Sequence, residues 1–343
     1  MPFALIYWLV IVVRNWLYDK KYFQSVSFGL PVICVGNLAV GGTGKSPMVE
    51  YLIEILKPNF KVATLSRGYK RKTKGYALAD KESTALEIGD EPMQFHLKFP
   101  EVPVAVGEKR IEAIPQLLHD KAETEVIILD DAFQHRQIKP GLNILLTDYN
   151  NLFTRDFYLP SGDLRDLKAN YKRAEIIIVS KCSAGLSEKE RDNVIEEVNP
   201  LAHQHVFFTT LDYGSLYHIA GKSDFIITEN TEVLLVSGIA NPKPLQHLLE
   251  EKCKTYSMIH YPDHHIFTID DLKDIRNKFQ AMEGDNKIIL STEKDAVRLA
   301  KFKAAVNELP LFIIPMRHRF LFDGAEPFNR LVTKFIKDFK KAG

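Results

Sequence analysis

Cysteine is scarce in this sequence, and the scarcity limits the chemistry that the chain can carry. The three cysteines, Cys34, Cys182 and Cys253, are an odd number, lie far apart and show no CxxC spacing. A disulfide framework or a cysteine-ligated zinc site is therefore not expected, and the usage fits a reducing cytosol. Because Cys34 lies within the apolar run 31–35, we expect it to be a small buried hydrophobic residue.

An excess of charge of either sign is also missing. The 343 residues include 45 Lys and Arg against 44 Asp and Glu, a net charge of +1, and 45% of the residues are hydrophobic. This balance excludes the chain-wide basic surface of a nonspecific nucleic-acid binder, so we expect no nucleic-acid partner. The apolar fraction excludes a wholly disordered chain, and the length is enough for about two domains. No feature indicates an obligate protein partner.

The apolar run at the N-terminus is too short to span a bilayer. Residues 3–13 are uninterrupted apolar, but as a helix they cover about 16 Å, roughly half of a ~30 Å hydrocarbon core. Arg14, Lys20 and Lys21 follow the run, whereas a secretory signal peptide has its basic residues before it. Two interpretations stay open. One is a helix lying in the membrane interface, with tryptophans and tyrosines at the headgroup level, and the other is a buried core helix.

What the chain does contain is an alternation of short β-branched runs with helical patterns. The expected strands are 31–35, 62–66, 126–129, 143–147, 175–179 and 206–210, followed by a second series at 232–236, 287–291 and 311–314. Helical stretches at 244–252 and 269–282 separate the second series. Strands alternating with helices predict an α/β fold, with a mostly parallel sheet covered by helices on both faces and a second, smaller α/β unit.

The strongest local signal is a glycine-rich turn between an apolar strand and a helix start, in residues 31–46. Backbone N–H groups of such a loop form an anion nest, and the helix N-terminus adds partial positive charge. We expect Lys45 to reach the β- and γ-phosphate oxygens and the Ser46 hydroxyl to ligate Mg²⁺. The expected nucleotide-binding residues are Ala39, Val40, Gly41, Gly42, Thr43, Gly44, Lys45 and Ser46. Ala39 stands where the strict motif has glycine, and a βα turn without a ligand is the alternative.

A second buried strand ends in two carboxylates. In P-loop folds the neighbouring strand places an acidic residue beside the metal, so Asp130 and Asp131 join Ser46 as expected Mg²⁺ ligands. Which aspartate meets the metal directly is left open, and solvated turn residues or a helix cap are the alternative. The guanine-reading Asn-Lys-x-Asp signature is absent, because Ser183 stands in the aspartate's place after Lys181. ATP is therefore favoured over GTP.

These features predict a P-loop NTPase-like fold in three parts. We place an N-terminal membrane-associating helix at 1–25, a P-loop kinase domain at 26–228 and a smaller α/β domain at 229–343. The polar stretch 223–231 separates the two series of strands. Whether the last helix, 328–341, packs on the first or the second domain is left open.

Seven motifs along the chain occur together in one known family. They are 35–47 (VGNLAVGGTGKSP), 66–69 (SRGY), 89–92 (GDEP), 130–135 (DDAFQH), 159–165 (LPSGDLR), 261–265 (YPDHH) and 292–295 (TEKD). In this respect the chain resembles the tetraacyldisaccharide 4′-kinases of lipid A biosynthesis. The resemblance implies ATP- and Mg²⁺-dependent transfer of the γ-phosphoryl group to the 4′-hydroxyl of an acylated glucosamine disaccharide 1-phosphate. It also implies a peripheral location on the cytoplasmic face of the bacterial inner membrane.

The resemblance assigns roles to residues that spacing alone does not. An alcohol kinase benefits from a group that takes the hydroxyl proton, and the family pattern assigns this to Asp90 with His264. On spacing alone, a helix cap for Asp90 and a surface turn for 263–265 would be favoured. The implied substrate-binding residues are Arg67, Tyr69, Arg71, Glu91, Arg110, Gln134, His135 and Arg165. Arg110 and Arg165 are expected to clamp phosphoryl oxygens, with a structural ion pair as the alternative.

The basic segment 61–75 contains six Lys and Arg and no acidic residue. Such a cluster is usually a solvated loop, but beside an apolar helix it could hold an anionic lipid headgroup. Three departures from the family pattern stand out: Ser46 in place of threonine, Ala-Phe at 132–133 in place of Gly-Leu, and Asp166 in place of glutamate. The last leaves the role of that carboxylate open.

Two other functions compete with the lipid kinase. A P-loop kinase of a soluble small molecule predicts unchanged activity when residues 1–20 are removed. A P-loop ATPase or GTPase switch protein predicts slow hydrolysis that a partner protein stimulates, without a phosphorylated acceptor.

Overall fold

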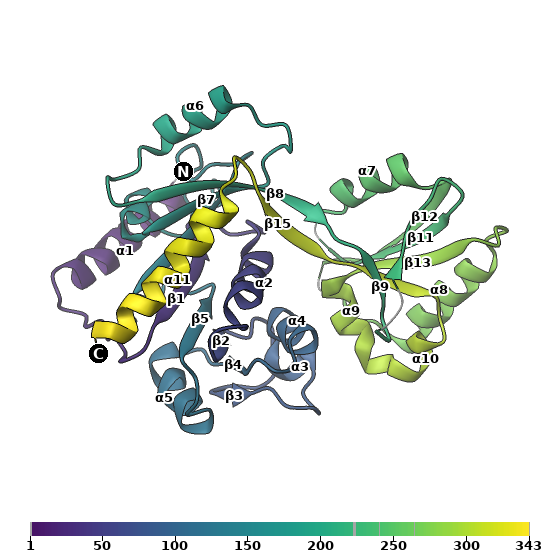
Figure 1. Ribbon diagram of the computed structural model, residues 1–343, viewed down its shortest axis with the longest axis horizontal. Helices are drawn as coiled ribbons and strands as arrows, with labels where there is room; N and C mark the ends of the chain where they lie inside the picture. Colours follow the sequence, from purple (N-terminus) through teal and green to yellow (C-terminus); the bar gives the residue numbers. More distant parts are fainter. Residues whose placement is uncertain (1, 222–223, 240, 264, 343) are drawn as a thin grey trace.

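The computed structural model describes residues 2–221, 224–239, 241–263 and 265–342. It contains two β-sheets, each with its own helices (Figure 1). We call the part around the first sheet the larger unit and the part around the second sheet the smaller unit. Figure 1 shows that β8 and β15 run side by side between the two units.

The first sheet has the order β15-β8-β7-β6-β1-β5-β2-β4-β3. Its strands are β1 (Val32–Asn37), β2 (Val62–Ser66), β3 (Ala77–Leu78), β4 (Val104–Val106), β5 (Val126–Asp130), β6 (Leu142–Asp148), β7 (Ile176–Ser180), β8 (His205–Tyr213) and β15 (Met316–Phe320). All neighbours from β8 to β4 are parallel, and the two edge strands are antiparallel to theirs. The expected mostly parallel sheet is therefore confirmed.

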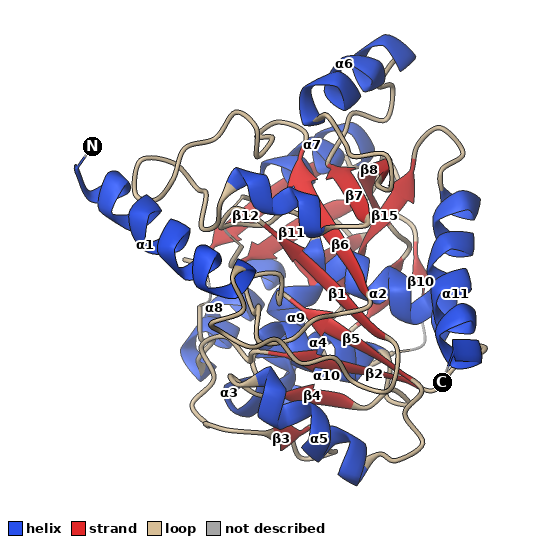
Figure 2. Ribbon diagram, turned by 90° about the vertical axis from the view of Figure 1, so that its left-hand side faces the viewer, coloured by secondary structure: helices blue, strands red, loops and turns tan. Residues whose placement is uncertain are grey.

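Helices cover both faces of this sheet (Figure 2). The helices are α1 (Pro2–Asp19), α2 (Lys45–Leu56), α3 (Ala85–Ile88), α4 (Asp90–Lys98), α5 (Arg110–Asp120), α6 (Glu188–Val198) and α11 (Ala325–Ala342), with a short 3₁₀ helix, η1 (Lys168–Arg173). Apolar residues of α2, α4 and α11 pack on one face of the sheet, and those of α5 and α6 pack on the other. Because both faces are covered, the central strands β1, β2, β5 and β7 are buried along their whole length, whereas the edge strand β15 alternates.

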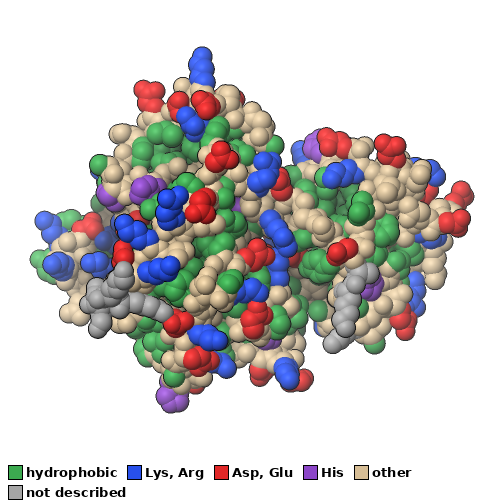
Figure 3. Space-filling view, viewed as in Figure 1, with side chains coloured by type: hydrophobic (Ala, Val, Ile, Leu, Met, Phe, Trp, Pro, Cys, Tyr) green, Lys and Arg blue, Asp and Glu red, His purple; other side chains and the backbone are tan. Residues whose placement is uncertain are grey.

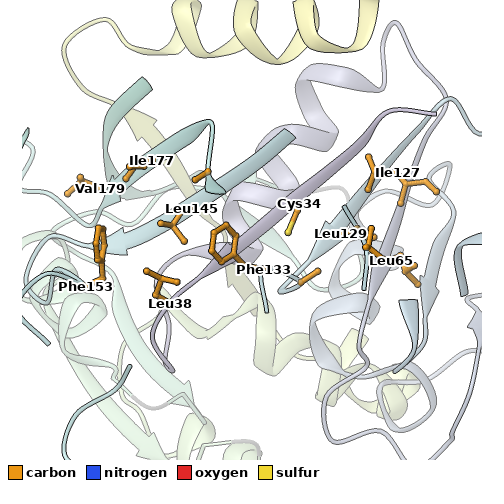
Figure 4. Packing of buried hydrophobic residues seen from close by; sticks show 14 of the residues in the cluster. Cys34, Leu38, Leu65, Ile127, Leu129, Phe133, Leu145, Phe153, Ile177 and Val179 are labelled. Atoms are coloured by element: carbon orange, nitrogen blue, oxygen red, sulfur yellow. The ribbon is translucent and has the colours of Figure 1, made fainter. Parts of the chain in front are cut away.

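The core of the larger unit includes the cysteine expected to be buried. Cys34 is 0% exposed and packs with Leu129 and Phe133 in one of the two apolar layers (Figure 4). Burial raises the pKa of its thiol to about 12. Cys34 is therefore an inert packing residue, as the sequence predicted.

The second sheet has the order β10-β9-β14-β13-β11-β12. Its strands are β9 (Leu216–His218), β10 (Asp224–Phe225), β11 (Glu232–Ser237), β12 (Thr255–His260), β13 (Lys287–Thr292) and β14 (Leu311–Ile314). Its helices are α7 (Lys243–Lys252), α8 (Ile269–Gln280), α9 (Glu293–Leu299) and α10 (Lys303–Asn307), with the 3₁₀ turn η2 (Ala300–Phe302). The strands from β14 to β12 are parallel, so this is a second α/β unit.

The chain enters the smaller unit before residue 228 and leaves it before the last helix. β9 and β10 pair within the second sheet, whereas β15 pairs with β8 in the first. Phe328, Val332 and Ile336 of α11 pack into the core of the larger unit. The last helix, whose place the sequence left open, thus lies on the larger unit, while the boundary at 228 and 229 stays a proposed division.

Helix α1 lies at the margin of the larger unit, with its N-terminal end pointing away from it (Figure 2). One side of the helix is anchored, since Ile11 and Asn15 are buried. The other side exposes large apolar side chains, namely Phe3, Leu5, Ile6, Leu9, Val10, Val13 and Trp16. Across the described part of the chain, no helix is both long and apolar enough to cross a membrane. The helix is therefore not a fully buried core helix.

Candidate active site

The carboxyl ends of three adjacent strands define the site. β1, β5 and β2 are neighbours in the sheet, so the residues that follow them meet at one edge. The glycine-rich loop follows β1, Asp130 ends β5 and Ser66 ends β2. In open α/β sheets, ligands bind at this edge. The strand, loop and helix order expected for the phosphate loop is present.

The phosphate loop ends in a glycine that no other residue could replace without strain. Gly44 has the left-handed φ of 83° and immediately precedes α2, and its carbonyl accepts the first helical hydrogen bond, from Met48 N. A Cβ built on Gly44 would lie 3.0 Å from the ring of His318. Backbone conformation and close packing thus both require glycine here.

His318, on β15, supports the loop at Gly44 and was not among the residues selected from the sequence. Its Nε2 lies 2.8 Å from the Gly44 carbonyl, which can only accept, so Nε2 carries the proton. Nδ1 is then the acceptor for the Thr209 hydroxyl, 2.9 Å away. Burial lowers the pKa of His318 to about 4, which keeps the ring neutral. The one available signal was the position of this histidine among alternating inward and outward residues of a strand.

Asp131 joins the loop lysine to an arginine from another segment. Its carboxylate lies 3.7 Å from Lys45 Nζ and accepts a hydrogen bond from Arg165 Nη1 at 3.1 Å. Burial raises the pKa of Asp131, but Lys45 and Arg165 more than offset this and bring it to about 2. Burial also lowers the pKa of Lys45, which Asp131 counteracts. The predicted nucleotide, metal and phosphate-clamp residues therefore converge.

Asn37, at the end of β1, organises this cluster and was not selected from the sequence. Its side chain accepts from Arg165 Nη2 at 2.5 Å and donates to the Thr43 hydroxyl at 3.0 Å. Its carbonyl accepts from Gln134 Nε2 at 2.6 Å. Asn37 thus connects the loop, the clamp arginine and the predicted substrate residue Gln134.

Asp130 is the more buried of the two aspartates. Burial raises its pKa to about 7, and the negative charges of Asp131 and Glu91 act in the same direction. The Ser66 hydroxyl donates to its Oδ2 at 3.3 Å. Lys45 and Arg110 act in the opposite direction, so burial is the main cause of the raised pKa.

Several basic side chains lie near the two aspartates. Arg110 is almost wholly buried, its Nη2 donates to the Asp130 carbonyl at 3.4 Å, and burial lowers its pKa to about 10. Burial, followed by the charges of Arg110 and Arg67, lowers the pKa of His135 to about 4. The Nε atoms of Arg110 and Arg165 are buried without a partner among the described residues. Such donors fit an anionic ligand.

Asp90 begins α4 directly after Gly89, whose φ is 96°. A Cβ on Gly89 would lie 3.1 Å from the Cα of Gly68, so the GDEP and SRGY motifs touch through their backbones. Arg298 of the smaller unit donates to Asp90 Oδ2 from Nη2 at 2.6 Å and from Nε at 3.1 Å. The predicted partner of Asp90, His264, lies outside the described residues.

Two predicted substrate residues differ from the rest in their surroundings. Arg71 is paired with Glu108 at 2.7 Å, and its side chain is 2% exposed. The ion pair braces the loop 68–75, because Glu108 also accepts from the Gly75 N–H at 2.9 Å. Tyr69 is 60% exposed, with the Lys70 ammonium 5.6 Å from its ring centre. Substrate binding by these two residues stays a prediction.

The parallel sheet, the phosphate loop and the aspartates at the next strand end define a P-loop phosphotransferase. A family model described as tetraacyldisaccharide-1-P 4′-kinase matches residues 1–337. The chain belongs to this family.

Relatives and a solved structure agree over nearly the whole length. Tetraacyldisaccharide 4′-kinases of Bacteroides thetaiotaomicron and Flavobacterium johnsoniae are 42% and 43% identical over 98% of this chain, covering 92% and 96% of their own. The crystal structure of the apo form of LpxK from Aquifex aeolicus in complex with ATP matches with a TM-score of 0.77 and 28% identity, over 98% of both chains. The resemblance inferred from the seven motifs is confirmed, and with it the kinase fold.

Proposed function

We propose that the chain carries out the reaction of its family at the carboxyl ends of β1, β5 and β2, with ATP as the phosphoryl donor. The acceptor is the 4′-hydroxyl of a tetraacylated glucosamine disaccharide 1-phosphate, an intermediate of lipid A biosynthesis. The observation that carries the proposal is the convergence of Lys45, Asp131 and Arg165 at this sheet edge, in a chain that matches the family over nearly its whole length.

The nucleotide phosphates lie on the loop 39–46, where backbone N–H groups and the start of α2 favour negative charge. Lys45 and Arg165 are both paired with Asp131 and are the cations that turn to the β- and γ-phosphates. Arg110 adds a buried guanidinium with an unused Nε. These cations offset the charge on the transferred phosphoryl group.

Mg²⁺ fits the oxygen ligands at this edge. Ser46 is the second residue of α2, and Asp130 and Asp131 follow one another at the end of β5. A hydroxyl and carboxylates are ligands that Mg²⁺ prefers. Burial raises the pKa of Asp130, and a bound cation would favour its ionised carboxylate. When bound, the ion would neutralise phosphate charge during transfer.

Asp90, assisted by His264, accepts the proton of the acceptor hydroxyl. The hydroxyl oxygen forms a bond to the γ-phosphorus while the bond from that phosphorus to the bridging oxygen breaks, which releases ADP. Support comes from the position of Asp90, whose GDEP motif touches the SRGY motif beside the end of β2. Arg67, Tyr69, Arg71, Glu91, Gln134 and His135 remain the proposed contacts to the acceptor.

Helix α1 seats the enzyme on the cytoplasmic face of the inner membrane. Its exposed side carries Phe3, Leu9, Val10 and Trp16, and Arg14 follows the apolar run. An apolar face flanked by basic and aromatic residues suits a helix in the membrane interface. A peripheral location fits a substrate whose acyl chains stay in the bilayer while its sugars reach the site.

The assignment of Asp90 and His264 is tested with Asp90→Asn and His264→Ala. Each variant is expected to lower kcat for phosphorylation of the lipid acceptor by about 100-fold or more, since general base catalysis contributes on that order. ATP binding, measured with a fluorescent analogue, is expected to be retained. Unchanged kcat in both variants would show that another group takes the proton.

A further inference from the structure

The two units meet through a pair of antiparallel helices, α4 of the larger unit and α9 of the smaller unit. Asp90 at the start of α4 pairs with Arg298 near the end of α9. At the other end of the pair, Lys98 of α4 contacts Glu293, the first residue of α9, at 2.8 Å. Between these ion pairs Val297 packs into an apolar cluster with Met93.

The Arg298 guanidinium is fixed by its own unit before it reaches Asp90. Nη1 donates to Asp295 Oδ1 at 3.2 Å and to the Gly238 carbonyl at 3.3 Å. Asp295 is itself fully buried and accepts from the Gly238 N–H at 3.0 Å and from the Thr292 hydroxyl at 2.8 Å. Arg298 therefore belongs to a hydrogen-bond network that orients it rigidly.

The other two nitrogen atoms of this guanidinium point to the larger unit. Nε and Nη2 both donate to Asp90 Oδ2, at 3.1 and 2.6 Å, and the Arg298 side chain is only 5% exposed. Two charge-assisted hydrogen bonds from one planar guanidinium hold this carboxylate oxygen in place. At a site shielded from water, a fixed donor of this kind substitutes for solvent at no reorganisation cost.

From this geometry we propose that Arg298 is a positioning residue for phosphoryl transfer. The smaller unit supplies the guanidinium that orients the Asp90 carboxylate toward the acceptor hydroxyl. The proposal rests on the proposed function, because it takes Asp90 as the proton acceptor. It extends that function, because the contact between α4 and α9 then helps to position the catalytic carboxylate.

Lys98 provides a matched control at the opposite end of the same helix pair. Its ammonium lies between Glu50 of α2 at 2.6 Å and Glu293 of α9 at 2.8 Å, at the end of the helix pair opposite to Asp90. A change at Lys98 weakens the docking of the two units but leaves the partners of Asp90 in place. If Arg298 acts only by docking the units, both positions should behave alike.

The test compares Arg298→Lys with Lys98→Arg, which both conserve charge, and adds Arg298→Met. Steady-state kcat and KM are measured for ATP and for the lipid acceptor in mixed micelles, together with binding of a fluorescent ATP analogue. Arg298→Met is expected to lower kcat about 100-fold, the effect of misplacing a catalytic group, with nucleotide binding within about twofold of the unchanged enzyme. Arg298→Lys is expected to recover about tenfold of that loss, and Lys98→Arg to keep kcat within about twofold.

Equal losses of kcat at positions 298 and 98, or a loss confined to nucleotide affinity, would overturn the positioning role. If Arg298→Met does not fold, Arg298→Lys and Lys98→Arg still test the positioning role, because only Arg298→Lys removes the paired hydrogen bonds to Asp90. Asp90→Asn separates the two proposals. If Asp90→Asn loses kcat and Arg298→Met does not, Arg298 has no positioning role. If Asp90→Asn keeps kcat, the assignment of the base itself fails.

Discussion

The side-chain amide of Asn15 donates a hydrogen bond to Asp166 Oδ1 across 3.1 Å, which fastens helix α1 to the segment that carries Arg165. Both side chains are buried, and Asn170 donates to each of them, at 3.1 and 2.6 Å. Arg136 donates to Asn15 Oδ1 at 2.8 Å. The carboxylate whose role the sequence left open thus holds the anchored side of the N-terminal helix.

Other contacts extend this attachment toward the site. The Tyr7 hydroxyl donates to the Arg165 carbonyl at 3.2 Å, and Arg14 Nη2 donates to the Gln134 carbonyl at 2.8 Å. Both acceptors belong to residues that also contact Asn37. Helix α1, which exposes the apolar side chains, therefore contacts two of the residues that surround Asn37 and the phosphate loop.

Removing the anchor should destabilise the enzyme. Asn15→Ala removes the buried hydrogen bonds that the amide makes with Asp166, Asn170 and Arg136, so we expect the free energy of unfolding to fall by about 1–3 kcal/mol. Val13→Ser, on the exposed side of the same helix, is the control and should change stability by less than about 0.5 kcal/mol. Chemical denaturation of both variants checks this, and equal stabilities would show that the hydrogen bonds of Asn15 contribute nothing.

The exposed side of α1 should determine membrane binding and not chemistry. Replacing Phe3, Leu9 and Val10 together by serine is expected to lower sedimentation with anionic vesicles at least tenfold, because apolar burial drives interfacial binding. Turnover in detergent micelles, where no bilayer is needed, should stay within about twofold of the unchanged enzyme. Vesicle binding that survives the triple substitution would place the membrane contact elsewhere.

Alanine should be tolerated at one loop glycine and not at another. Gly44→Ala forces a side chain into a φ of 83° and against His318, so we expect a loss of about 1–2 kcal/mol in unfolding free energy and weaker ATP binding. At Gly42 φ is not in the left-handed region and an added Cβ meets nothing within 4 Å. Gly42→Ala should therefore keep the stability of the ligand-free enzyme. Similar melting temperatures for both variants would contradict the role of His318 as the support of Gly44.

The charge cluster between the units should make stability depend on pH. Burial raises the pKa of Glu50 from 4.5 to about 7, and Glu293 acts in the same direction. Between pH 4.5 and about 7, Glu50 of the folded protein holds a proton that the unfolded chain has released. The contribution of Glu50 to stability is therefore complete below pH 4.5 and is lost as the pH rises through 7.

Glu50→Gln removes the titrating group and keeps the hydrogen-bonding shape. The difference in unfolding free energy, unchanged enzyme minus variant, should decline by up to about 3 kcal/mol between pH 4.5 and 7.5. Urea denaturation of both proteins across this range measures the difference. A difference that does not vary with pH would mean that Glu50 titrates normally.

The features that lie close together along the chain could be predicted from the sequence. Strands β2 and β14 have the bounds expected for 62–66 and 311–314, and the loop 38–44 leads into α2 as its glycines and Lys45 indicate. Each of these signals is local, since hydrophobic runs, permissive turns and helix starts are encoded by neighbouring residues. The shortest strands, such as β3 and β9, carry too few residues for any pattern.

The residues that sequence reasoning missed act across long separations. Arg298 reaches Asp90 over 208 positions, and His318 reaches Gly44 over 274. Neither residue lies in a local motif. Their roles depend on how the fold brings α9 against α4 and β15 against the phosphate loop. On the face drawn in Figure 3, acidic and basic side chains are interspersed over both units. The net charge of +1 does not reveal the two buried charge clusters that join the units, Asp90 with Arg298 and Lys98 with Glu293.

Transfer of phosphate from ATP to an acylated sugar hydroxyl is the reaction expected at this site. Purified enzyme is incubated with γ-labelled ATP and Mg²⁺, together with the tetraacylated glucosamine disaccharide 1-phosphate, the same disaccharide without acyl chains, or no acceptor. We predict label on the lipid at its 4′-position, little on the sugar without acyl chains, and almost none released as inorganic phosphate. Label appearing only as inorganic phosphate, or equally on the soluble sugar, would show that the site is not that of a lipid kinase.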